Sequence, residues 1–356
     1  MKLKSLIMFS AAALAFAACS NDNEAVNGSI EGNGVVEVKL TAPVSRAVNA
    51  TPGEDGDKVT VEGPITVTLY CAGGPKTETI STEDAAAGKV VKFWDVTAPT
   101  KVTASVNNGG ASYAEVPVAS FKDIMPAKIP AYGESGTFTP TGKTEVNAEN
   151  NKTYEMYSAS VAMSIPVARL EVSGIKHVDE GTCKYATLTI DGIYLDKIKE
   201  TQGAASVTDY HYPAVGVEGE AGYIPAPILW EAIAAPNDFL AKGAVWPAAV
   251  GEKEQAYAFN FYPNENLPMP IVKIYFEKAE GNGVAVAQPR YAMIKTYNNQ
   301  ENFKFEAGKI YRIKDVELAD KNIIGDEEGN TLWGVNVTVV EAEWTVVDLN
   351  AEWVSE

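Results

Sequence analysis

The sequence predicts an all-β protein of the sandwich class, on three observations. Many short segments alternate apolar and polar residues with a period of two, as in "ITVTLY" at residues 65–70 and "ATLTIDGIYL" at residues 186–195. Gly, Pro, Asn and Asp, which favour turns, separate these segments. No segment keeps a helical period over several turns. Many short strands with few helices form sandwiches, in which two sheets bury their apolar faces against each other.

The first residues, "MKLKSLIMFSAAALAFAAC", have the pattern of a secretory signal. Lys2 and Lys4 precede an apolar run that is too short to span a membrane, and small residues lead directly to Cys19. The segment "LAFAAC" resembles a bacterial lipobox, so we expect a lipoprotein signal peptide at residues 1–18 and a lipid on the sulfur of Cys19. An ordinary signal peptide that ends beside a chance cysteine is the alternative.

A polar tether follows Cys19 and leads into one well-patterned strand, "VVEVKLTAPVSR". The apolar residues of this strand alternate with other residues and therefore fall on one face. They are Val36, Val38, Leu40, Ala42 and Val44. The strand ends at Arg46, and the segment "AVNATPGEDGDK" that begins at Ala47 is rich in Gly, Pro and Asp. This composition predicts an exposed loop immediately after Arg46.

Further strands, with turn residues between them, are predicted along the rest of the chain. They cover residues 58–71, 90–96, 101–106, 112–119, 154–164, 168–175, 185–195, 255–262, 271–278, 290–294 and 309–317. The best helix candidate is residues 227–243, which Pro236 splits.

A length of 356 residues suggests two domains, and a new series of strands begins at "SIPVARLEVSG". We therefore expect the domain boundary near this segment. The predicted parts are residues 1–18 (signal peptide), 19–46 (lipidated tether and first strand), 47–165 (N-terminal sandwich), 166–330 (C-terminal sandwich) and 331–356 (tail).

The tail alternates apolar and polar residues up to a break at Glu341, resumes the alternation, and then changes phase. Its apolar positions are Val335, Val337, Val339, Trp344, Val346, Val347 and Leu349. Terminal residues of ordinary domains fray, so a long apolar strand at this place requires a partner sheet. Either the tail completes a sheet of its own domain, or it adds to a sheet edge of another chain.

Composition argues against several function classes. The formal net charge of -18 excludes a nucleic-acid binder, because phosphate backbones need a basic surface. The 2 histidines, His177 and His211, stand far apart in the sequence, and we expect both at the surface or in loops. No phosphate-binding, dinucleotide-binding or zinc-protease motif is present. We expect no cofactor, no metal and no catalytic residue, although a glycosidase pair among the 47 acidic residues is unsupported rather than excluded.

Two features leave alternatives open. Cys71 and Cys183 are able to pair in an oxidising compartment, but they fall in different predicted domains, which favours free thiols. Trp230, Phe239 and Trp246 either cover the open end of a sandwich core or form an aromatic platform for a glycan.

Several of these features together resemble the fimbrillins, the pilin lipoproteins of Bacteroidales fimbriae. They are the lipobox, the strand that ends at Arg46, the restart "VARLEVSGI", the segment "FKFEAGKIYRI" and the tail "WTVVDLNAEW". These features follow one another in the same order as in that family, and together they span nearly the whole chain. It implies two transthyretin-like β-sandwich domains in tandem, an outer membrane lipoprotein precursor, and cleavage between Arg46 and Ala47 by a protease of trypsin-like specificity.

The resemblance also implies polymerisation by strand exchange into a cell-surface fimbria that supports adhesion, and physical reasoning leads to the same expectation. A removed first strand leaves a groove with unpaired backbone groups, which a terminal strand of another subunit can fill. The expected partners are further copies of this chain, other fimbrial subunits and the processing protease. The alternatives are a tip or anchor protein of the fimbria, or a surface lipoprotein that binds glycans.

Overall fold

The structure is a computed structural model. It describes residues 34–41, 63–107, 116–122, 128–178, 187–206, 219–221, 227–234, 239–252, 255–263, 270–281, 284–285, 290–297, 303–314, 316–324, 333–335 and 338–340. Among these residues no helix is long and apolar enough to cross a membrane.

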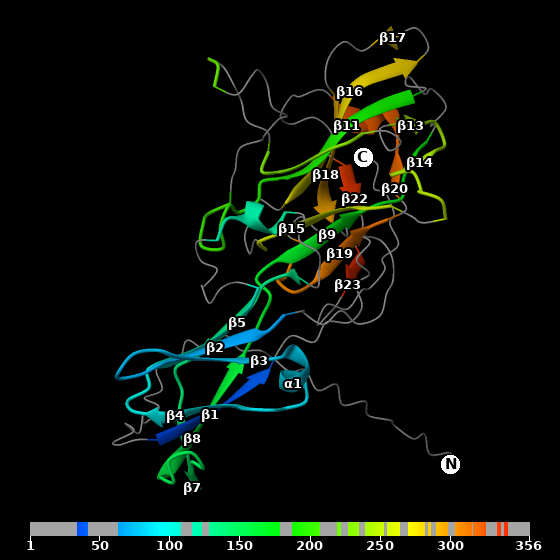
Figure 1. The fold of residues 1–356 in the computed structure, drawn as a ribbon. Coiled ribbons are helices and arrows are strands. Elements are labelled where there is room, and N and C mark those ends of the chain that lie inside the picture. The colour runs from blue at the N-terminus through cyan, green and yellow to red at the C-terminus, as the bar shows by residue number, and fades with distance from the viewer. Residues whose placement is uncertain are drawn as a thin grey trace, which may run out of the picture.

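The elements up to residue 162 are mainly strands. They are β1 (Gly34–Thr41), β2 (Ile65–Tyr70), β3 (Lys76–Ile80), α1 (Thr82–Ala86), β4 (Val91–Val96), β5 (Lys101–Val106), the 3-10 helix η1 (Val118–Phe121), β6 (Ala131–Ser135), β7 (Thr139–Val146) and β8 (Thr153–Ala162). The strands form two four-stranded sheets, ordered β4-β1-β8-β7 and β3-β2-β5-β6. These sheets make up the lower lobe of the molecule (Figure 1).

The two sheets of this lower lobe enclose an apolar core. Val36 on β1, Val67 on β2 and Val102 on β5 are fully buried, and they belong to one continuous hydrophobic cluster. Along β2 the buried positions alternate with more exposed ones, which is the pattern of a strand with one face against a core. The predicted alternation of "ITVTLY" therefore corresponds to a real inward face.

The remaining elements form the upper lobe (Figure 1). They are β9 (Ala168–Val172), β10 (Ile175–His177), β11 (Thr187–Asp196), β12 (Leu229–Ala232), β13 (Phe239–Ala241), β14 (Val245–Trp246), β15 (Tyr257–Phe261), β16 (Ile271–Gly281), β17 (Val284–Ala285), β18 (Arg290–Tyr297), β19 (Ile310–Ile313), β20 (Val316–Leu318), the 3-10 helix η3 (Asp320–Asn322), β21 (Ile323–Ile324), β22 (Trp333–Val335) and β23 (Thr338–Val340). One large sheet runs β12-β11-β16-β18-β21, and smaller sheets run β15-β9-β19-β23 and β14-β10-β20. The all-β fold class is confirmed.

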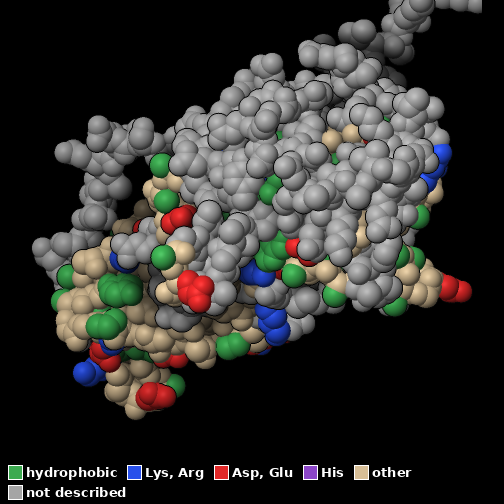
Figure 2. All heavy atoms as spheres, turned by 90° about the horizontal axis from the view of Figure 1, so that it is seen from above, with side chains coloured by type: hydrophobic (Ala, Val, Ile, Leu, Met, Phe, Trp, Pro, Cys, Tyr) green, Lys and Arg blue, Asp and Glu red, His purple; other side chains and the backbone are tan. Residues whose placement is uncertain are grey.

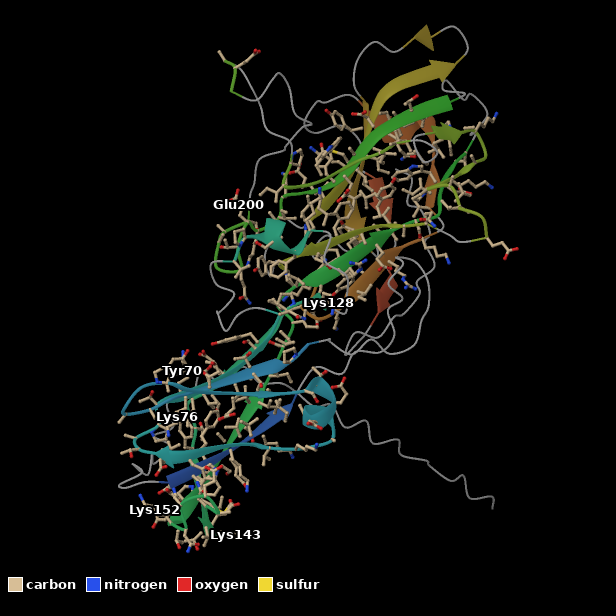
Figure 3. All side chains as sticks on the ribbon, in the orientation of Figure 1. Tyr70, Lys76, Lys128, Lys143, Lys152 and Glu200 are labelled. Carbon is tan, nitrogen blue, oxygen red and sulfur yellow. The ribbon has the colours of Figure 1, made fainter. Side chains whose placement is uncertain are left out.

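A segment of the N-terminal half, residues 116–122, docks on the strands of the upper lobe. The backbone N–H of Val118 donates to the Glu200 carbonyl at 2.7 Å, and the Lys122 ammonium donates to the Trp230 carbonyl at 2.6 Å. The ring of Phe121 packs edge-on against Tyr262 with the centroids 5.4 Å apart. Figure 3 places Glu200 in the upper lobe and Lys128, which follows the docked segment in sequence, near the junction of the two lobes.

The prediction of a strand in the docked segment is wrong. A strand was expected at residues 112–119, but Val118 to Phe121 form a 3-10 helix. Val118 and Phe121, three residues apart, are both almost fully buried. One turn of 3-10 helix places such a pair on the same side, and burial against the upper lobe therefore overrides the local strand preference.

The helix predicted at residues 227–243 is also wrong. This stretch contains β12 and β13, and both strands pair antiparallel with β11. The ring of Trp230 lies over Gly192 of β11 so closely that a Cβ atom at Gly192 would come within 2.0 Å of it. Pairing and this ring contact, which come from residues distant in the sequence, outweigh the weak helical preference of the stretch.

His177 is not a surface residue as the sequence suggested. It lies on β10 with a side chain that is 0% exposed, and its Nε2 atom is 3.2 Å from Oδ1 of Asp320. His211 lies outside the described residues. The surface seen in Figure 2 carries acidic, basic and hydrophobic side chains scattered among one another over its described parts.

Candidate assembly site

Strand β1 occupies the centre of its sheet. It runs parallel to β8 in continuous register from Gly34 opposite Glu155 to Thr41 opposite Ala162, and antiparallel to β4 on its other side. Between β1 and β4, Val38 lies opposite Val91. Because β4 follows β1 at the end of the sheet order, removal of β1 would separate β4 from the rest of the sheet.

The predicted apolar residues of β1 are buried where the structure describes them, and Val35 on the opposite face is buried as well. Val36 and Val38 are 0% exposed and Leu40 is 4% exposed, and all three belong to the core cluster. Full burial of one such side chain stabilises a fold by roughly 1.5–3 kcal/mol, so the three together contribute about 5–9 kcal/mol before ordering costs. Ala42 and Val44 lie outside the described residues.

A charged contact, which the sequence analysis did not identify, fixes β1 on its outward face. The Lys92 ammonium on β4 lies 3.0 Å from Oε1 of Glu37 on β1 and 2.6 Å from Oε1 of Glu145 on β7. The hydrogen bond to Glu145, and after it the contacts with Glu37, raise the pKa of Lys92 above its ordinary value, although burial acts in the opposite direction. Glu37 in the middle of an apolar strand was the only signal in the sequence.

The absence of β1 would therefore have a definite chemical consequence. The facing edges of β4 and β8 would present unpaired backbone N–H and C=O groups, beside an apolar slot that held Val36, Val38 and Leu40. An extended segment with an apolar residue at every second position is the complement of such a groove.

The described parts of the tail are two short strands that pair with the chain's own upper lobe. β22 pairs parallel with β18, and β23 pairs antiparallel with β19, with Val340 opposite Ile310 and Thr338 opposite Arg312. β23 is the outer strand of its sheet. Val335 and Val339 lie on these strands, whereas Val337, Trp344, Val346, Val347 and Leu349 lie outside the described residues.

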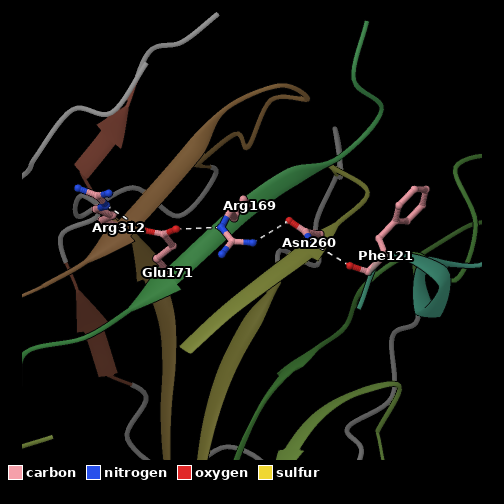
Figure 4. A network of polar contacts seen from close by, with 5 residues as sticks. All are labelled: Phe121, Arg169, Glu171, Asn260 and Arg312. Atoms are coloured by element: carbon pink, nitrogen blue, oxygen red, sulfur yellow. Dashed lines mark hydrogen bonds and ion pairs between the residues drawn. The ribbon is translucent and has the colours of Figure 1, made fainter. Parts of the chain in front are cut away.

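Strand β19, which pairs with β23, also carries part of a buried row of polar groups (Figure 4). The Nε atoms of Arg169 and Arg312 lie 2.8 and 2.9 Å from the two carboxylate oxygens of Glu171. Arg169 contacts Asn260 at 3.4 Å, and Asn260 donates to the carbonyl of Phe121 at 2.9 Å. The row thus connects β19, β9 and β15 with the docked segment of the N-terminal half.

The ionisation of Glu171 follows from this arrangement. Burial alone would raise its pKa, but the positive charges of Arg169 and Arg312 beside it lower the pKa below the ordinary value. Its side chain is 1% exposed, so these charges are desolvated and depend on one another.

The remaining sequence-predicted sites are placed as follows. Cys19, Arg46, Ala47 and Cys183 lie outside the described residues, and Cys71 is a free, half-buried thiol that donates to the Gly74 carbonyl at 3.3 Å. Within the described part of the chain no group of three or more His, Cys, Asp or Glu side chains could hold a metal ion.

The aromatic platform for a glycan is contradicted at Trp246. Its ring is 0% exposed and stacks on Tyr257 with the centroids 5.2 Å apart. The ring of Trp230 packs on Tyr194 with the centroids 5.6 Å apart. Trp246 belongs to the core cluster, as the alternative interpretation expected, whereas Trp230 is half-buried. The side chain of Phe239 lies outside the described ones.

Comparisons with known proteins return structural likeness alone. No family profile matches the chain, and no curated protein matches it. Two solved structures of proteins named for cell adhesion are similar. The one from Bacteroides eggerthii has a TM-score of 0.45 at 16% identity over 90% of this chain and 94% of its own. The one from Parabacteroides distasonis has a TM-score of 0.46 at 10% identity over 86% of this chain and 96% of its own. A fimbrilin from Porphyromonas gingivalis has a TM-score of 0.42 at 14% identity over 90% of this chain and 99% of its own. Similarities at this level transfer no function.

Proposed function

We propose that this chain is a structural subunit of a cell-surface fimbria and that it polymerises by exchange of β1 for the C-terminal tail of a neighbouring subunit. The observation that carries the proposal is the central place of β1 in its sheet, between β4 and β8. A central strand at the beginning of a chain can be removed by one cut, and only another strand can then satisfy both of its neighbours.

The cut is proposed between Arg46 and Ala47, five residues beyond the end of β1 at Thr41. A protease of trypsin-like specificity cleaves after an accessible arginine or lysine. Arg169 and Arg312 are 4% and 3% exposed and lie within strands, which protects them from such a protease. The Gly-, Pro- and Asp-rich composition after Arg46 favours access there.

The energetics favour transfer of the tail. On its own subunit β23 is an edge strand with a short ladder to β19. In the groove of a neighbour the tail would pair on both sides, with β4 and with β8. The tail would exchange a ladder on one side for ladders on both sides and would bury its apolar stripe. Both changes stabilise the assembled state relative to the free subunits. A contact of this head-to-tail type does not close, so repeated exchange builds a filament.

Before cleavage, the subunit is proposed to be an outer membrane lipoprotein. The basis is the lipobox-like segment that ends at Cys19, whose acyl chains would hold the precursor at the membrane. Release of residues 19–46 by the protease removes this anchor together with β1. One cut therefore frees the subunit and opens its groove.

Electron microscopy of the purified protein, before and after digestion with a trypsin-like protease, tests the function. We expect no filaments from the uncleaved protein, because β1 occupies its groove, and filaments after the cut. Uncleaved protein in which Arg46 is replaced by glutamine is the matched control and should form none after the same treatment. Cleaved protein that stays monomeric at high concentration would refute the proposed function.

A tip or anchor subunit of the same fimbria is the second candidate. The pairing of β22 and β23 with strands of their own chain favours it, because a tail that stays in its own sheet cannot be donated. Such a subunit would cap filaments of other subunits and would not form filaments from copies of itself. The electron microscopy experiment separates the two functions.

A further inference from the structure

The tail contains a segment that is partly identical to β1 and has the same alternation of apolar and polar positions. Residues 35–40 of β1 read "VVEVKL", and residues 339–344 of the tail read "VVEAEW". The similarity extends by one more identity, since Thr41 at the end of β1 corresponds to Thr345. We propose that residues 338–345 of one subunit take the place of residues 34–41 in the next, in the same direction and in this register. This inference rests on the proposed strand exchange and specifies it.

The inward face of the tail fits the slot in this register. The slot holds Val36, Val38 and Leu40, and the corresponding tail residues are all apolar. They are Val340, Ala342 and Trp344. Trp344 is larger than the leucine it replaces and Ala342 is smaller than the valine, so the apolar stripe is kept while its volume shifts along the strand.

The outward carboxylate of Glu37 is also kept, although the exposed Lys39 on the same face is replaced by Glu343. In the precursor Glu37 faces Lys92, which lies between it and Glu145. In the proposed register Glu341 takes the position of Glu37, so Lys92 again has a carboxylate on each side. A slip by one residue would turn Glu341 into the apolar slot, which is the strongest error a strand register can make. Lys92 and Glu341 are therefore the residues that specify the register.

The register selects one of the two apolar phases of the tail. Val346 continues the inward face of Val340, Ala342 and Trp344, whereas Val347 falls on the opposite face. Val335 and Val337 of the first apolar stripe lie before the donor segment in this register, whereas Val339 takes the position of Val35 on the face opposite Val340.

The direction in which the donor strand runs determines at which end of the lower lobe the donor subunit lies. Gly34 lies opposite Glu155 near the start of β8, next to the β7–β8 turn, and Thr41 lies opposite Ala162, where β8 leads on to the upper lobe. Figure 3 shows Lys143 and Lys152 at the far end of the lower lobe, away from Lys128. A tail that runs like β1 enters the groove at this far end. The upper lobe of the donor then lies beyond it, which is a head-to-tail arrangement.

Cysteine cross-linking in assembled filaments tests the register. Lys39 lies opposite Ser160 of β8, and both side chains are exposed, so Glu343 of the donor should meet Ser160 of the acceptor. Facing positions in adjacent strands have Cα separations within disulfide range. The pair Glu343→Cys and Ser160→Cys, with Cys71 and Cys183 replaced by serine, should form disulfide-linked ladders after cleavage and oxidation.

The matched controls combine Glu343→Cys with Ser158→Cys or with Ala162→Cys, which lie opposite Glu37 and Thr41, two residues away on either side. We expect at least a tenfold lower yield of ladders from both. Ladders from a control pair, or from none of the pairs although filaments are seen, would overturn the register. Absence of filaments from the cleaved unsubstituted protein would instead refute strand exchange itself.

A charge exchange gives an independent readout. Lys92→Glu should raise the protein concentration needed for filament formation at least about two- to fivefold, because a half-buried ion pair is lost and like charges then face each other. Adding Glu341→Lys to the same chain should restore filament formation in part, because this pair is then reversed while the repulsion from Glu145 remains. Absence of any restoration in the double variant would contradict the placement of Glu341 beside Lys92.

Discussion

Protein that lacks residues 331–356 should fold but form no filaments after cleavage. In the uncleaved form β1 still fills its sheet, and the truncation removes β22 and β23, of which β23 is an outer strand. Loss of a short edge strand costs a sheet far less than loss of a central one, so we expect thermal melting close to that of the full-length precursor. After the cut, the groove has no strand to receive, and electron microscopy should show no filaments.

A point variant guards against an indirect effect of the truncation. Trp344→Asp in the full-length chain keeps β22 and β23 but places a charge in the donor stripe, which opposes burial in an apolar slot. It should prevent filament formation equally. Truncated protein that still assembles would contradict strand donation by the tail, and so would a truncated precursor that is already unfolded.

Replacement of Glu171 by glutamine should lower the free energy of unfolding by about 3–5 kcal/mol, which is the usual cost of breaking a buried ion pair. The change keeps the size of the side chain but leaves the charges of Arg169 and Arg312 without their shared carboxylate in a buried site. Urea unfolding at neutral pH measures the difference. Glu306→Gln is the matched control, because Glu306 is 62% exposed and pairs with Lys309 at the surface, where such pairs contribute about 0–1 kcal/mol.

The contribution of Glu171 to the free energy of unfolding should decrease as the pH falls. Its pKa is lowered in the folded protein, so its stabilising contribution is complete above the ordinary value of 4.5 and is lost as the pH falls through the lower folded pKa. The difference between the unsubstituted protein and Glu171→Gln should therefore shrink on acidification below about pH 4.5. A difference that is small at neutral pH, or that grows on acidification, would contradict this role.

Sequence reasoning could find β1 but could not place it. The alternation in "VVEVKLT" predicts a half-buried strand from local pattern alone. Its partners β4 and β8 begin at Val91 and Thr153, far along the chain, and no local pattern encodes such pairing. The similarity of the tail to β1 likewise gains meaning only when the inward residues and the partner of Glu37 are known.

Two of the strands that sequence reasoning missed, β3 and β7, have little apolar signal. β3, "KTETI", and β7, "TPTGKTEV", contain almost no buried residues, because both lie at the edge of a sheet. Edge strands carry polar and charged residues that discourage pairing with other chains. Their sequence pattern therefore resembles that of a loop. The buried row was missed for a related reason: Arg169 and Glu171 occupy alternate positions of β9 and read as a solvent-facing side, although both are buried.

The N-terminal peptide of subunits in assembled filaments tests the central claim most directly. Mass spectrometry should find that it begins at Ala47, while the N-terminal peptide of the membrane-bound precursor begins at Cys19 and carries acyl chains. The fragment of residues 19–46 should also be absent from these filaments, because a cleaved β1 that stayed in its sheet would leave no place for the tail. Filament subunits that begin at Cys19 or Ser20, with β1 still attached, would contradict the exchange of β1 for the tail of a neighbour.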